Sequence, residues 1–119
     1  MMRVATVLMA LLPLAAAAAE GAVAEKEIAH LIAHLRASGC QFNRNGSWHT
    51  ADRAVVHLNN KYAYLRKRGL VPDAEAFIER AATESSASGK PYLVKCADAA
   101  PIPSAKWLQD ELQRYRAQR

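Results

Sequence analysis

Residues 40–50 have the sequence Cys40-Gln41-Phe42-Asn43-Arg44-Asn45-Gly46-Ser47-Trp48-His49-Thr50. Asn45-Gly46 is the strongest short hairpin signal, because both central residues of a type I′ turn need a positive φ, which asparagine and glycine tolerate. The stretch therefore predicts a strand, a tight turn and a second short strand. Thr50 is then placed to cap the helix that follows.

Residues 1–19 have the pattern of a secretory signal peptide. Arg3 gives a short positive region, residues 4–14 are mostly apolar, and Ala17-Ala18-Ala19 fits the rule for cleavage before Glu20. We therefore expect export to the periplasm or outside the cell, with residues 20–119 forming one small globular domain. An uncleaved N-terminal membrane anchor is the alternative, although the apolar stretch is short for a spanning helix.

Cys40 and Cys96 are the two cysteines of the chain. A disulfide is the default for two cysteines in an oxidising compartment, so export predicts a bond between them. Closing a loop of this length contributes about 4 kcal/mol to stability by restricting the unfolded chain. A nucleophilic Cys40 assisted by His57 is the competing interpretation, but an exported free thiol would oxidise unless it were protected.

The periodicity of apolar residues predicts helices after and before the hairpin. Asp73 is placed to cap the third helix and Ser104 to cap the fourth. Gly89 suits the end of the third helix, because glycine adopts the left-handed conformation that commonly follows a helix. The expected helices cover residues 24–37, 51–68, about 74–88 and 105–116.

The order of the elements predicts an α+β fold. Residues 92–96 follow Pro91 and are rich in strand-forming side chains, whereas residues 97–103 are expected to form a loop. About four helices should pack on a small antiparallel sheet, made of the hairpin around Asn45-Gly46 plus strand 92–96, with one disulfide. The expected core cluster is Leu31, Leu35, Leu58, Phe77, Ile78 and Leu108.

The formal net charge of +5 is mild, and it does not predict nucleic-acid binding. The basic clusters at residues 66–68 and 114–119 lie at expected helix ends, where cations complement the helix dipole. No pair of carboxylates is forced together by spacing, so glycosidase chemistry is unsupported.

His30 and His34 are four residues apart on the first expected helix, with Glu27 one turn earlier. This spacing suits a metal, but the H-E-x-x-H motif is absent, so we expect a solvated polar face and no metal. The G-x-x-x-x-G-K-[ST] motif is also absent, and no cofactor is predicted.

One set of polar residues predicts a binding site. His57 and Lys61 are neighbours on one helix flank, because they are four residues apart. The serine-rich segment 85–90 leads into the strand that ends at Cys96, and the disulfide ties that strand to the one carrying Arg44. Such cations, hydroxyls and amides favour a small anionic ligand. The predicted site consists of Arg44, Asn45, His57, Lys61, Ser86, Ser88, Lys90 and Tyr92.

The same residues leave three interpretations open. A non-enzymatic binding or structural module would engage a small anionic ligand or a periplasmic protein. A small hydrolase would use Ser86 or Ser88 with His57 and Lys61, which requires a serine hydroxyl within hydrogen-bond reach of His57. The third interpretation is structural, with the polar groups satisfying one another and capping the third helix.

Several motifs follow one another in a fixed order along the chain. They are residues 42–46, His57-Leu58 with Lys61-Tyr62, Phe77-Ile78, residues 85–92, and Trp107-Leu108 with Leu112 and Tyr115-Arg116. Together they resemble a family of short exported bacterial proteins known only as a domain of unknown function. The resemblance covers nearly all of residues 20–119, and it implies export without implying an activity, a substrate or catalytic residues. One position departs from the family, because Asn43 stands where the family has isoleucine.

The disulfide gives the first testable prediction. Thiol titration of the exported protein, purified without reductant and unfolded in denaturant, should detect no free thiol, because Cys40 and Cys96 are bonded to each other. Two free thiols would contradict the prediction.

Overall fold

The computed structural model describes Ala5 and residues 14–119, with side-chain surroundings from residue 20 onward. The predicted α+β class is confirmed: the described residues form four helices and a four-stranded antiparallel sheet in the order β2-β1-β3-β4. Most of the predicted signal peptide, residues 1–19, lies outside the described residues. The elements are α1 Leu14–Ala37, β1 Gln41–Arg44, β2 Ser47–His49, α2 Ala51–Lys67, α3 Ala74–Ala81, β3 Leu93–Lys95, β4 Ile102–Pro103 and α4 Ser104–Ala117.

The β1–β2 hairpin forms around the predicted turn. Asn45 and Gly46 have φ angles of 54° and 85°, as a type I′ turn requires. The Asn43 side-chain oxygen accepts a hydrogen bond from the Gly46 amide at 3.1 Å, so this asparagine supports the turn. The Arg44↔Ser47 pair closes the hairpin.

The disulfide between Cys40 and Cys96 is confirmed, with Cα atoms 4.4 Å apart. It lies directly beyond the Gln41↔Lys95 pair, where β1 and β3 run antiparallel. The bond therefore joins the start of β1 to the end of β3 and holds the centre of the sheet together.

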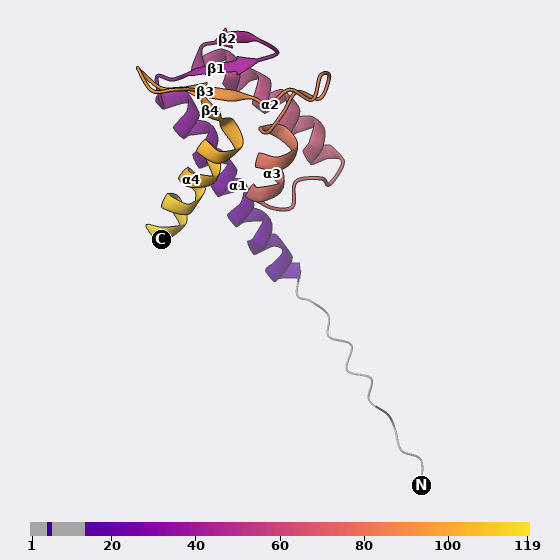
Figure 1. The fold of residues 1–119 in the computed structure, drawn as a ribbon. Coiled ribbons are helices and arrows are strands. Elements are labelled where there is room, and N and C mark those ends of the chain that lie inside the picture. The colour runs from indigo at the N-terminus through magenta and orange to yellow at the C-terminus, as the bar shows by residue number, and fades with distance from the viewer. Residues whose placement is uncertain (1–4, 6–13) are drawn as a thin grey trace.

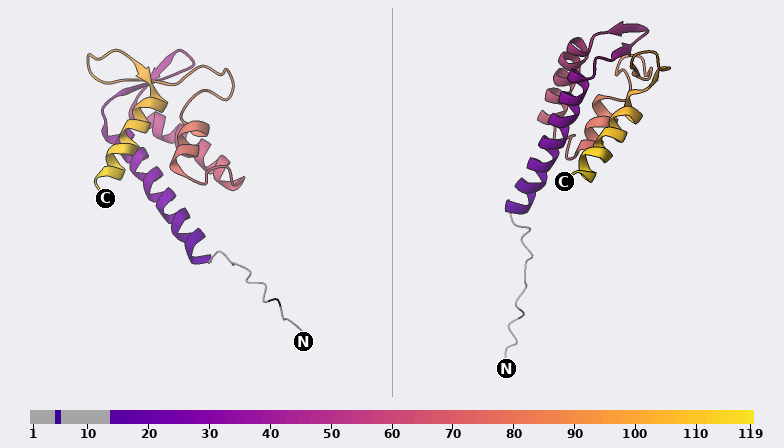
Figure 2. Two further views of the ribbon diagram at one scale, coloured as in Figure 1. Left: turned by 60° about the horizontal axis from the view of Figure 1, so that its bottom comes forward. Right: turned by 90° about the vertical axis from the view of Figure 1, so that its left-hand side faces the viewer.

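The helices lie in two layers, and the sheet covers one end of them (Figures 1 and 2). α1 and α2 run side by side in one layer, and α3 and α4 pack against them in the other. Two of the predicted caps form as expected: Thr50 accepts a hydrogen bond from the Arg53 amide, and Asp73 accepts one from the Ala76 amide.

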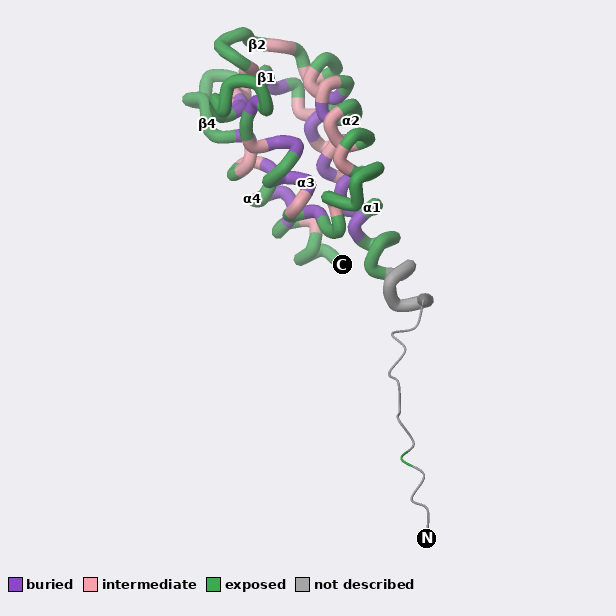
Figure 3. The backbone as a smooth tube through the Cα atoms, turned by 90° about the vertical axis from the view of Figure 1, so that its right-hand side faces the viewer, coloured by how far each residue is buried: buried purple, intermediate pink, exposed green. Residues whose placement is uncertain are grey.

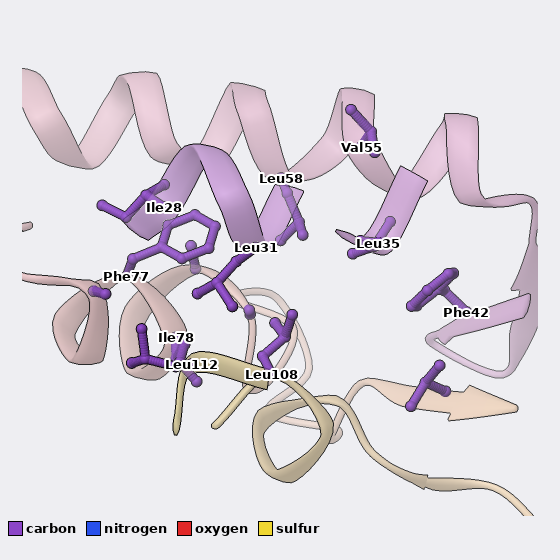
Figure 4. Close-up of a cluster of buried hydrophobic side chains, with 14 of the residues drawn as sticks. Ile28, Leu31, Leu35, Phe42, Val55, Leu58, Phe77, Ile78, Leu108 and Leu112 are labelled. Carbon is purple, nitrogen blue, oxygen red and sulfur yellow. The ribbon is translucent and has the colours of Figure 1, made fainter. Parts of the chain in front are cut away.

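The predicted core residues all belong to one buried cluster between the layers (Figure 4). Buried positions follow the inward sides of the helices, whereas the outer sides are exposed (Figure 3). Phe42 extends this cluster to the sheet, because it points from β1 toward the helices. The predicted members are Leu31, Leu35, Leu58, Phe77, Ile78 and Leu108.

The third helix is shorter than predicted. α3 ends at Ala81, and the chain then turns back so that the Thr83 carbonyl accepts a hydrogen bond from the Tyr92 amide. Glu84 pairs with Pro91 across this excursion, and the serine-rich segment forms a turn at its tip. Pairing with the segment before β3 therefore overrides the helical tendency of residues 82–88.

Other predicted boundaries also differ from the structure. α1 begins at Leu14 instead of residue 24, and β3 covers Leu93–Lys95 within the predicted strand 92–96. β4 occupies part of the predicted loop, where Pro103 is tolerated because the strand lies at the sheet edge. Ser104 was expected to cap α4, but it is the first helical residue and makes no capping hydrogen bond.

The expected solvated polar face of α1 is wrong, because α4 packs across it. Glu27 is only 3% exposed, and Arg116 donates two hydrogen bonds to its carboxylate at 2.7 and 2.9 Å. These bonds lower the pKa of the Glu27 carboxyl. His30 and His34 both lie within 3.1 Å of the Glu111 carboxylate. The polar sides of α1 and α4 therefore contact each other.

None of the helices within the described part of the chain has the length and apolar character needed to cross a membrane.

Truncation of Leu58 tests the core assignment. Leu58 is 6% exposed, so Leu58→Ala should lower the free energy of unfolding by about 2–5 kcal/mol, measured by urea denaturation. Val56→Ala on the same helix is the control, because Val56 is 61% exposed and should lose less than about 0.5 kcal/mol. Equal losses in the two variants would contradict the assignment.

Candidate functional site

A cavity of about 470 Å³ opens between the hairpin, the first half of α2 and the start of α4. Ligand sites in proteins typically have volumes of about 300–1,000 Å³ and mostly apolar walls with a few converging polar groups. The apolar side chains include Leu35, Phe42, Ala54, Leu58, Trp107 and Leu108. The polar lining includes Arg44, His49, His57, Tyr92 and Ser104.

The register of the sheet explains how the polar groups reach the cavity. Phe42 and Arg44 lie on one face of β1, because alternate side chains of a strand share a face. Phe42 is opposite Val94 and Asn43 is opposite Leu93 in the β1–β3 pair, and continuing this register by one residue places Arg44 opposite Tyr92. The sheet face directed at the helices therefore carries an arginine beside a tyrosine.

Four of the predicted site residues form one hydrogen-bonded chain. Arg44 Nη1 lies 2.8 Å from His57 Nδ1, and His57 Nε2 lies 3.0 Å from Tyr92 Oη. Lys61 Nζ lies 3.2 Å from the same Tyr92 oxygen and also donates to the Glu84 carbonyl. The spacing prediction for His57 and Lys61 is thus met, because both reach Tyr92 from one flank of α2.

The hydrogen bonds of His57 determine which of its ring nitrogens carries the proton. Arginine can only donate, so Nδ1 must accept from Arg44, and the neutral ring then carries its proton on Nε2. Nε2 therefore donates to Tyr92 Oη. Burial lowers the pKa of His57, and the neighbouring Arg44 and Lys61 lower it further. His57 is consequently neutral near pH 7.

Burial also shifts the pKa values of Lys61 and Tyr92. Burial lowers the pKa of Lys61, and Glu84 partly opposes this effect. Burial raises the pKa of Tyr92, which favours the protonated phenol.

Three of the remaining predicted site residues, Ser86, Ser88 and Lys90, lie on the serine-rich turn, and Asn45 lies at the tip of the hairpin. Ser88 Oγ donates to the Asn45 side-chain oxygen, so the turn contacts the tip of the hairpin. Ser88 Oγ also accepts from the Lys90 amide, and the side chains of Ser86 and Lys90 are exposed. Of these four residues, none belongs to the cavity lining within the described chain. Of the eight predicted site residues, Arg44, His57 and Tyr92 line the cavity, and the other five, including Lys61, lie outside its lining.

The arrangement required for the hydrolase interpretation is not formed. Both ring nitrogens of His57 are engaged, one with Arg44 and the other with Tyr92. In the described region, no serine hydroxyl is hydrogen bonded to His57, and Ser88 is turned toward Asn45. Neither serine is thus activated by the histidine in this structure.

Sequence reasoning missed the residues that make the cavity distinctive. Ser104 is 6% exposed, and its hydroxyl has no hydrogen-bond partner among the described residues. Trp107 packs its ring edge against Phe42, with ring centroids 5.7 Å apart. The alternation of Phe42 and Arg44 along β1 was an available signal. Nothing local marked Ser104, because it occupies the position expected of a helix cap.

Across the residues described here, no group of three metal-ligating side chains is arranged to hold a metal ion. The contacts of His30 and His34 with Glu111 therefore carry no metal assignment.

Residues 22–116 match a family of unknown function, DUF5329. The chain belongs to this family. It is also 45% identical over 51 residues to an uncharacterised protein, YfeK, from Salmonella typhimurium. That match covers 43% of this chain and 41% of the Salmonella protein, so the chain spans about two-fifths of that relative's length. No solved structure matches the chain.

The lowered pKa of His57 predicts how the stability of this member of the DUF5329 family depends on pH. The unfolded chain takes up the imidazole proton near the usual pKa of 6.5, whereas the folded protein takes it up only at lower pH. The unfolded state then binds more protons, so the free energy of unfolding should fall as the pH drops below about 6.5.

His57→Asn tests this response, because the amide oxygen can still accept from Arg44 but does not titrate. Urea denaturation at about pH 8 and about pH 5 should show a smaller loss of stability for the variant than for the wild type. The lowered pKa of His34 affects both proteins alike. An unchanged pH dependence in His57→Asn would contradict the assignment of a neutral, half-buried His57.

Proposed function

We propose that this domain is an exported, non-enzymatic binding protein whose small-molecule ligand occupies the cavity between the hairpin, α2 and α4. The observation that carries the proposal is the Ser104 hydroxyl, which lines the cavity and is buried with no hydrogen-bond partner among the residues that the structure describes. The apolar walls would supply affinity, and the polar groups would fix the orientation of the ligand.

The Ser104 hydroxyl argues for a ligand on energetic grounds. More than about 90% of buried polar groups in proteins have a hydrogen-bond partner, and an unpaired one costs about 1–3 kcal/mol. Such a loss is large for a small domain, whose net stability is about 5–15 kcal/mol. A polar atom of a bound molecule would satisfy the hydroxyl.

Binding is a better account of the polar side chains than catalysis. Both ring nitrogens of His57 are hydrogen bonded, one to Arg44 and the other to Tyr92. His57 therefore orients these two side chains and does not activate a nucleophile. The exposed turn with Ser86 and Lys90 lies outside the cavity lining and takes no part in the proposal.

The proposed location is the periplasm. The signal-like residues 1–19 support export, and the Cys40–Cys96 disulfide is compatible with an oxidising compartment. The predicted cleavage point before Glu20 falls within α1, so cleavage would remove the first part of that helix.

A neutral apolar fluorophore tests the cavity without reference to charge. Phenylnaphthylamine should bind the protein at one saturable site, detected as an increase in its emission when it leaves water. Ala54→Phe should weaken this binding at least about tenfold, because Ala54 lines the cavity and the added ring would fill it.

Ala63→Phe is the matched control, because Ala63 lies on the exposed side of the same helix. This variant should bind phenylnaphthylamine as the wild type does. No saturable binding, or equal binding by the wild type and Ala54→Phe, would contradict the proposed function.

A further inference from the structure

The geometry points to an amphipathic organic carboxylate as the ligand. Its carboxylate would lie at Arg44 and Tyr92, and its apolar body would lie along Phe42 and Trp107. This inference rests on the proposed binding function and adds the chemical class of the ligand.

The first argument is the hydrogen bonding of Tyr92. A phenol oxygen offers two acceptor positions and one proton to donate. The oxygen of Tyr92 receives the His57 Nε2 proton and a Lys61 Nζ proton, which occupies both acceptor positions. The Tyr92 proton then has no acceptor among the described residues, although Tyr92 is only 7% exposed and lines the cavity. The cavity wall therefore presents a donor that needs an acceptor.

The second argument is the charge of Arg44. Its guanidinium carries five N–H donors, and the structure shows one side-chain partner for them, His57 Nδ1. Within the described chain, no carboxylate lies within salt-bridge distance of this half-buried arginine. Lys61 adds a second cation, which donates to the Tyr92 oxygen from outside the cavity lining. The two cations flank the unsatisfied Tyr92 hydroxyl, so an anion is the complementary ligand group.

Other titratable groups do not neutralise this end of the cavity. Asp52 and Arg53 also line the cavity, but both are exposed and of opposite charge. Burial is the main cause of the lowered pKa of His57, and the positive charges of Arg44 and Lys61 lower it further by repelling the protonated ring. A bound anion would offset this repulsion, whereas a cationic ligand would increase it.

The rest of the cavity selects the apolar part of the ligand. A planar guanidinium fork matches a carboxylate, and the apolar lining beyond it disfavours a second charged group. The unpartnered Ser104 hydroxyl provides a further polar contact along the walls. A single carboxylate on an apolar or aromatic body therefore fits the lining better than a highly charged phosphate ester.

Three competitors with the same body separate charge from shape. Phenylbutyrate, phenylbutanol and phenylbutylamine should each displace bound phenylnaphthylamine from the wild type at moderate salt and neutral pH. Phenylbutyrate should compete about tenfold or more better than the alcohol, because it accepts charge-assisted hydrogen bonds from Arg44 and a hydrogen bond from Tyr92. The amine should be the weakest competitor.

Arg44→Gln should abolish the preference for phenylbutyrate, measured for each variant as the ratio of the competition constants of phenylbutyrate and phenylbutanol. Arg36→Gln is the matched control, because Arg36 is exposed and outside the cavity lining, and it should keep the preference. Tyr92→Phe should reduce the preference several-fold, and it serves as the second test if Arg44→Gln does not fold.

The outcomes separate the two proposals. Equal competition by the three compounds, or a preference that survives in both Arg44→Gln and Tyr92→Phe, would overturn the carboxylate inference and leave the binding function intact. Failure of phenylnaphthylamine to bind the folded wild type would overturn both proposals.

Discussion

The pairing of β1 with β3, held by the disulfide between Cys40 and Cys96, is the constraint on which the core and the cavity both depend. Side chains alternate along a strand, so a slip of one residue would turn Phe42 and Arg44 to solvent together. The observed register places Phe42 in the core cluster and Arg44 at the cavity wall beside Tyr92. One covalent bond at the strand ends thus fixes the apolar and polar parts of the site at the same time.

The apolar wall of the cavity depends on a polar interface between α1 and α4. Trp107 lies between Phe42 and His34, with its ring centroid 4.6 Å from that of His34. His34 in turn contacts the buried Glu111 carboxylate. Further along the same helices, Arg116 binds the buried Glu27. Removing one partner of a buried ion pair is costly, because the other charge is left unpaired. These contacts therefore hold α4 against α1, in the position from which Trp107 contacts Phe42 of β1.

Local signals in the sequence were enough to predict the hairpin and two helix caps, because each depends on a few neighbouring residues. The disulfide was predicted on other grounds, because Cys40 and Cys96 are the two cysteines of a chain with an export signal. The end of α3 and strand β4 were missed, since both are decided by pairing with residues before and within β3. The convergence of Arg44, His57, Lys61 and Tyr92 followed from helix spacing and the disulfide link. The cavity itself could not be predicted, because it depends on where α4 places Ser104 and its neighbours.

The strongest indication of function is a group of polar side chains whose hydrogen bonds or charges the fold does not satisfy. Ser104 and Tyr92 each have a hydroxyl proton without an acceptor among the described residues, and both line the same cavity. Arg44 lines the same cavity and has no carboxylate partner in the described chain. An apolar residue of similar shape in place of Ser104 would make the folded state more stable. Sequences usually agree with their fold at every level except at functional sites. Three such exceptions around one cavity have a common explanation in a ligand that accepts hydrogen bonds and carries negative charge.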